Sequence, residues 1–120
     1  EEHYETLREA SNYAVLLFRL ERYKEAKSLL RETMPIARRV LDESNETTLR
    51  MRWLYAVALC QADGATLDDL REAVTTLEET TRIARRVFGG AHPFTTGVEE
   101  ALRQARARLR ARETQSSARA

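Results

Sequence analysis

The sequence contains few of the residues that form disulfides or favour turns: its 120 residues include one cysteine, two prolines and four glycines. A single cysteine, Cys60, excludes a disulfide within the chain and fits a reducing compartment, so we expect a cytoplasmic location. Few glycines and prolines disfavour an all-β fold, which needs many turns. No apolar run reaches the about 18 residues of a transmembrane helix, and no signal peptide is recognisable, so we expect no membrane insertion.

An excess of charge of one sign is also lacking, with 20 basic and 19 acidic residues and a net charge of +1. This balance disfavours a protein whose whole surface binds nucleic acid. The distribution is less even, because residues 101–120 contain six arginines and one acid, Glu113. Only the C-terminal end of the chain is therefore basic.

Alanine, leucine, arginine and glutamate dominate the sequence, and these strong helix formers predict an all-α fold. Apolar residues recur at three- and four-residue spacing in successive segments. We expect five helices over residues 4–19, 22–41, 46–61, 66–88 and 93–112, followed by a polar, disordered tail over residues 113–120.

Several local signals place the ends of these helices. Thr66 and Asp69 have the spacing of a capping box, with aspartate in the usual place of glutamate. Gly89-Gly90 ends the fourth helix, and Pro93 suits the first turn of the fifth. Pro35 falls inside the second helix, where it removes a backbone hydrogen bond, so we expect a kink near residues 33–35.

The chain repeats itself. Ile36–Leu41 (I-A-R-R-V-L) returns 47 residues later as Ile83–Phe88 (I-A-R-R-V-F), and the equivalent positions Thr6, Thr48 and Thr95 are 42 and 47 residues apart. One pair of helices cannot bury its own apolar face, whereas stacked pairs can, so the repeat predicts an α-solenoid of antiparallel helical hairpins. We divide the chain into repeat 1 (1–43), repeat 2 (44–90, with a five-residue insertion near 63–67), a basic helix (91–112) and the tail (113–120).

The repeat resembles the tetratricopeptide repeat, and more narrowly its kinesin-light-chain-like form. The residues that carry the resemblance are His3 and Thr6, Asn12-Tyr13-Ala14, Glu25-Ala26, Ile36–Leu41, Tyr55-Ala56, Glu72-Ala73, Ile83–Gly89 and the phrase His92-Pro93-Phe94-Thr95. Tyr4, Asn45-Glu46, Leu54 and Arg103 depart from it. The fifth helix is then either a solvating cap or the first helix of a further repeat. The opening Glu-Glu-His also leads us to expect a piece of a longer protein.

The resemblance implies a function in protein–protein interaction, as a scaffold or adaptor that binds a partner peptide in a concave groove lined by the first helix of each repeat. A lining of cations, amides and aromatic residues suits an extended peptide with acidic and apolar residues. The groove positions are Arg8, Ser11, Asn12, Val15, Phe18, Arg19, Arg50, Trp53, Val57, Cys60 and Gln61. The small residues Ala14, Ala26, Ala56 and Ala73 would allow the paired helices to cross closely.

Catalytic, metal and cofactor sites are not expected. The two histidines, His3 and His92, occupy equivalent repeat positions, so they would lie too far apart to converge on a metal or a substrate. Cys60 has no activating base beside it in the sequence. We expect a protein that is not an enzyme.

Two alternatives stay open. The repeats could extend a longer solenoid or a large complex without binding a specific peptide, and the last helix could drive self-association. Arg103, Arg106 and Arg110 share one face of that helix and could bind an anionic surface. No aromatic residue follows Phe94, however, so stacking on nucleic-acid bases is unsupported.

Overall fold

The computed structural model describes the backbone of residues 2–119 and the side chains of residues 4–118. Within this range the chain forms helices and no strands, which confirms the all-α prediction. The helices are α1 (Glu2–Arg19), α2 (Tyr23–Leu41), α3 (Glu46–Gln61), α4 (Leu67–Phe88) and α5 (Pro93–Arg119). None of these helices has the length and apolar character needed to cross a membrane.

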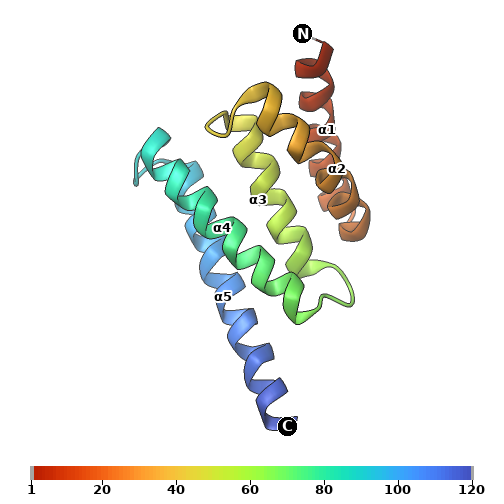
Figure 1. Ribbon diagram of the computed structural model, residues 1–120, viewed down its shortest axis with the longest axis vertical. Helices are drawn as coiled ribbons and strands as arrows, with labels where there is room; N and C mark the ends of the chain where they lie inside the picture. The colour runs from red at the N-terminus through yellow and green to blue at the C-terminus, as the bar shows by residue number, and fades with distance from the viewer. Residues whose placement is uncertain (1, 120) are drawn as a thin grey trace.

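The helices stack in chain order, each against the next, and the first helices of the units also contact each other, α1 with α3 and α3 with α5. The result is an elongated molecule of 52 × 31 × 24 Å whose two ends lie at opposite ends of its long axis (Figure 1). The C-terminal half of α5 extends beyond the other helices. This is the stacking of hairpins that a helical repeat needs to bury its apolar faces.

The structure supports the 47-residue step between the two units. The Thr48 hydroxyl donates to the carbonyl of Ala37 at 3.4 Å, and the Thr95 hydroxyl donates to the carbonyl of Ala84 at 3.3 Å. Both members of the second pair lie 47 residues beyond those of the first. The same threonine therefore ties the start of one unit to the end of the previous helix at both junctions.

The five-residue insertion divides between a loop and a helix. The α1–α2 connection spans residues 20–22, whereas the α3–α4 connection spans 62–66. Tyr23, the first residue of α2, is equivalent to Leu70, so α4 also begins three residues earlier than α2 does. The extra turn starts with the predicted capping box: the Asp69 amide donates to Thr66 Oγ1, and the Thr66 amide donates to the Asp69 carboxylate, both at 3.0 Å.

The predicted helix ends agree with the structure to within two residues, except at the C-terminus. Gly89 ends α4 at a φ of +93°, a backbone conformation that glycine adopts without strain. The expected disordered tail is wrong, because α5 continues to Arg119 instead of ending at Arg112. Residues 113–119 include no proline or glycine that would stop a helix, and Glu113 lies 3.8 Å from Arg71 of α4, which ties the next turn to the array.

Helix α2 is continuous across Pro35. Two residues earlier, the Thr33 hydroxyl donates to the Leu29 carbonyl at 2.9 Å. Such a bond to the preceding turn often accompanies a bend. The kink itself stays a prediction.

The core combines leucines with small residues at the helix crossings. Leu30 and its equivalent Leu77 are both buried. The alanines expected to allow close packing are fully buried, which removes the space that a larger side chain would need. They are Ala14, Ala26, Ala56 and Ala73.

Candidate functional site

The residues predicted to line a groove fall into three classes of exposure. The exposed ones are Arg8, Asn12, Arg19 and Gln61. The half-buried ones are Val15, Phe18, Arg50, Trp53 and Val57. Ser11 and Cys60 are buried. All of them lie on α1 and α3, the two contacting first helices of the repeat units.

Ser11 is a correction to the predicted set. Its side chain is 2% exposed, so it cannot contact a peptide on the surface. The reason is its place on α1: Leu7 and Ala14, four residues before and three residues after it, are buried, and these spacings put all three on one helix face. The resemblance supplied this position, whereas the helical spacing indicates burial.

Two aromatic groove candidates also support the fold. The Phe18 ring meets Tyr23 of α2 edge to face, with 5.3 Å between ring centroids. Trp53 meets Phe94 of α5 in the same way at 5.2 Å. The Trp53 indole also covers Gly97, where an added Cβ would lie 2.6 Å from Cη2 of the indole. Gly97 therefore lets α5 approach the half-buried tryptophan of α3.

Three predicted residues line pockets between α3 and α5. Val57, Cys60 and Gln61 border a small cavity of about 30 Å³, together with Gln104 and Arg108 of α5. Cys60 and Gln61 also border a larger open pocket of about 750 Å³ at the end of α3. The predicted surface on α3 is therefore hollowed where it meets α5.

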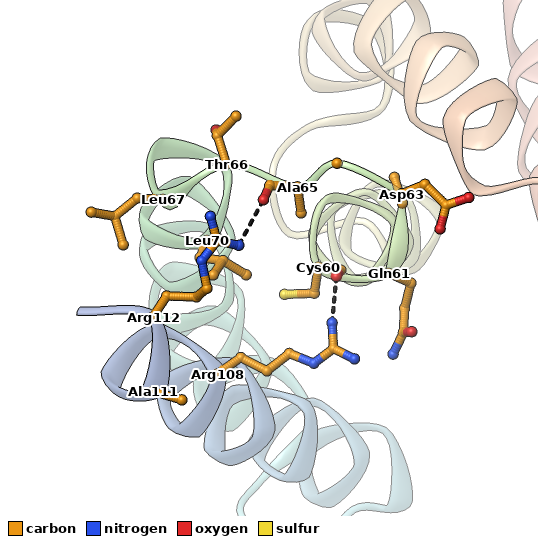
Figure 2. Close-up of a pocket in the computed structure, with 12 residues that line it drawn as sticks. Cys60, Gln61, Asp63, Ala65, Thr66, Leu67, Leu70, Arg108, Ala111 and Arg112 are labelled. Atoms are coloured by element: carbon orange, nitrogen blue, oxygen red, sulfur yellow. Dashed lines mark hydrogen bonds between the residues drawn. The ribbon is translucent and has the colours of Figure 1, made fainter. Parts of the chain in front are cut away.

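The larger pocket joins the α3–α4 loop to two arginines of α5 (Figure 2). Arg108 donates to the carbonyl of Cys60, in the last turn of α3, and Arg112 donates to the carbonyl of Ala65 at 2.8 Å. A cation at the C-terminal end of a helix is favourable, because unpaired carbonyls point there. Arg108 therefore ties the end of α3 to α5, and Arg112 ties the inserted loop to α5. Sequence analysis assigned them no role, since both bonds join residues more than 40 positions apart.

The Cys60 thiol has the properties of a packing residue. Burial raises its pKa, an effect only partly opposed by the nearby charge of Arg108. A raised pKa leaves the thiol protonated at neutral pH, and the thiolate is the reactive form. The structure gives no support to nucleophilic chemistry at this residue.

His92 shapes the loop before α5. Its Nδ1 accepts a hydrogen bond from the Phe94 amide at 3.0 Å, and its ring stacks on Phe88 with 4.7 Å between centroids. These contacts give His92 a structural role in the loop between α4 and α5. The side chain of its equivalent, His3, lies outside the described residues.

The arginines proposed for an anionic surface are partly neutralised. Arg106 pairs with Glu78 of α4 at 3.0 Å, and Arg103 pairs with Glu100 within α5. Arg110 borders a shallow pocket together with Glu113. Arg103 and Arg106 therefore each have an acidic partner, and binding of an anionic surface by this face stays a prediction.

A buried arginine that sequence analysis missed connects three parts of the chain. Arg52 of α3 is 4% exposed. Its guanidinium pairs with Glu79 of α4 and, at 3.4 Å, with Glu43 in the α2–α3 loop. Helical spacing alone does not reveal this site, because the partners lie 9 and 27 residues away.

This pair predicts a loss of stability in acid. The hydrogen bond from Arg52, together with its charge, lowers the pKa of Glu79 in the folded chain. A carboxylate with a lowered folded-state pKa stabilises the fold above its unfolded pKa of about 4.3, and this contribution is lost as the pH falls through the folded-state value. We expect the urea midpoint to decrease as the pH is lowered below about 5, and to decrease less steeply in Glu79→Gln.

The check is a series of urea titrations between neutral and acid pH. Glu32→Gln, at an exposed position on α2, controls for the loss of one negative charge. Parallel pH profiles for the parent and Glu79→Gln would contradict the role given to the Arg52–Glu79 pair.

Comparison with known proteins gives one family match. Residues 6–45, one third of the chain, match the tetratricopeptide repeat family. The matched range contains most of α1 and all of α2, so it corresponds to the first hairpin. No curated protein and no solved structure matches the chain. Repeats of this family generally mediate protein–protein interaction. The match and the stacked hairpins together support a repeat protein of the tetratricopeptide type.

Proposed function

We propose that the chain is a non-enzymatic scaffold or adaptor module that binds an extended peptide of a partner protein. The binding surface is formed by α1, α3 and α5, and we call it the first-helix surface; its predicted contacts are Arg8, Asn12, Arg19, Gln61 and the half-buried Val57. The echo of Ile36–Leu41 in Ile83–Phe88, with the His92–Thr95 phrase, supports assigning the repeats to the kinesin-light-chain-like subtype.

The observation that carries this proposal is the pair of pockets between α3 and α5, which include three of the predicted residues. Exposed polar groups border them, while Val57 and Cys60 supply apolar atoms. The backbone of a bound peptide needs such hydrogen-bonding groups, and the apolar side chains of the peptide need a pocket to occupy.

Charge defines the expected peptide. Arg8 lies over the ring of Tyr4, with its guanidinium carbon 5.8 Å from the centroid, and Arg19 is exposed at the other end of α1. Both can donate paired hydrogen bonds to a carboxylate. We therefore expect acidic residues in the peptide, separated by apolar ones that occupy the α3–α5 hollow.

The test pans a phage-displayed random peptide library against the whole chain. We expect recovered peptides to combine acidic and apolar residues. Binding should weaken by about tenfold or more in Arg8→Glu/Arg19→Glu, because charge-assisted hydrogen bonds contribute about 1.5–3 kcal/mol. Binding constants of the recovered peptides, measured by calorimetry for parent and variant, decide the outcome.

Arg39→Glu/Arg86→Glu is the matched control, because it makes the same charge change at exposed, equivalent positions of the two second helices. Equal loss of binding in both double variants would show a general charge effect and contradict a site on the first-helix surface. Peptides without acidic residues would contradict the expected chemistry.

A further inference from the structure

The first helices of the units have two faces that pack differently. One face meets the second helix of the same unit, and the other meets the second helix of the unit before. On α3, where both are covered, Tyr55 and Ala58 lie on the side of α2 and are 3% and 0% exposed. On α5 the equivalents Leu102 and Ala105 are 7% and 2% exposed. We call this the upstream face.

The contact of α2 with the upstream face of α3 has a polar anchor. Arg31 donates to the Tyr55 hydroxyl at 3.0 Å, and its guanidinium carbon lies 5.8 Å from the centre of the tyrosine ring. Tyr55 in turn donates to Glu72 of α4 at 2.7 Å. A leucine, Leu29, packs beside Ala58 at the same junction.

On α1 the upstream face is open and apolar. Tyr13 and Leu16 of α1, and Leu20 directly after this helix, lie 42 residues before Tyr55, Ala58 and Ala62. They are 50%, 48% and 54% exposed, whereas Ala62 is 6% exposed. Helix α1 lies at the edge of the array, where no described helix precedes it (Figure 1). Three large apolar side chains thus share this face. The residues equivalent to Tyr13 and Leu16 are buried in both later units, and those equivalent to Leu20 are buried at the end of α3 and partly buried on α5.

The other end of the array has the opposite character. On α5 the positions equivalent to Trp53, Ala56 and Leu59 are Glu100, Arg103 and Arg106, all exposed. A polar outer face is what a terminal helix of a repeat array needs for solubility. Of the two interpretations of α5, this polar face favours the solvating cap. The outer faces at the two ends of the array therefore differ, being polar on α5 and apolar on α1.

From this asymmetry we propose that the upstream face of α1 is a docking surface for a helical hairpin of the same repeat type. The docking helix occupies the place that α2 has on α3. It carries small residues opposite Leu16 and Leu20, because these are larger than Ala58 and Ala62. It also carries an arginine that donates a hydrogen bond to the Tyr13 hydroxyl, as Arg31 donates to the Tyr55 hydroxyl. This surface is separate from the first-helix surface proposed to bind peptides.

The test adds one hairpin to the whole chain. A second copy of residues 2–43 is placed directly before Glu2, so that the copied α2 precedes α1 by the natural spacing. The copy carries Leu29→Ala, because Leu29 packs beside Ala58 and its copy would meet the larger Leu16. We expect one cooperative urea transition at a higher midpoint than that of the parent, since neighbouring repeats stabilise each other. Leu16→Glu in the extended chain should abolish the increase in midpoint. Leu16→Ala should keep the increase, because alanine is the residue at the equivalent position 58 of α3.

Leu16→Glu and Leu16→Ala in the parent chain are the controls, and we expect little change there because this side chain is half exposed. Two separate transitions in both the extended chain and its Leu16→Ala variant would overturn the proposal. Sedimentation velocity of the parent gives a second outcome. A dimer that Leu16→Glu dissociates would show that a second copy of the chain, and not a hairpin, covers this face.

Discussion

Gly97→Ala should destabilise the protein, although alanine favours helix formation more than glycine does. A Cβ at position 97 would lie 2.6 Å from Cη2 and 3.1 Å from Cζ2 of the Trp53 indole. The indole also packs on Phe94, which restricts its movement. Overpacking costs about 1–3 kcal/mol, whereas replacing glycine in a helix gains about 1 kcal/mol, so we expect a net loss of up to about 2 kcal/mol in urea unfolding.

The control for this prediction removes the indole. Trp53→Ala alone should cost about 2–3 kcal/mol, less than the loss of a fully buried tryptophan, because the side chain is half-buried. In that background, Gly97→Ala should become neutral or stabilise by up to about 1 kcal/mol. A destabilisation of equal size in both backgrounds would contradict the close approach of α5 to Trp53.

Ala26→Leu should lower the free energy of unfolding by about 1–3 kcal/mol through overpacking. Ala26 is fully buried beside Leu17 of α1 and Ala58 of α3, so a leucine at this crossing must displace one of these helices. Ser28→Leu, an exposed position on the same helix, controls for the change in residue type. Thermal melts compare the variants, and a midpoint of Ala26→Leu equal to that of the parent would show that the repeat register is wrong.

Local signals explain why most of the fold could be predicted. Thr66 with Asp69, Gly89 and Pro93 each act on neighbouring backbone atoms, so their effect is visible in a few residues of sequence. The repeated Ile-Ala-Arg-Arg-Val phrase then placed the second helices in register. Where such a signal is missing, after Arg112, the predicted end of α5 was wrong.

The site was less accessible to sequence reasoning, because it depends on contacts between distant residues. The burial of Arg52 requires acids from a loop and from α4, and the fit of Gly97 requires Trp53. Ser11 was assigned to the surface by resemblance, although its spacing from Leu7 and Ala14 puts it on the buried face. Equivalent repeat positions therefore predict location in the array better than they predict exposure.

Both proposed surfaces depend on the register in which each unit meets the helix before it, so that register is the central claim. Methyl-resolved nuclear Overhauser spectra of the whole chain test it directly. The account predicts cross-peaks between the methyl groups of Thr48 and Ala37 and between those of Thr95 and Ala84, whose side chains are all buried at the two junctions. Cross-peaks from either threonine to residues one helical turn away from its alanine, with none to the alanine itself, would contradict it.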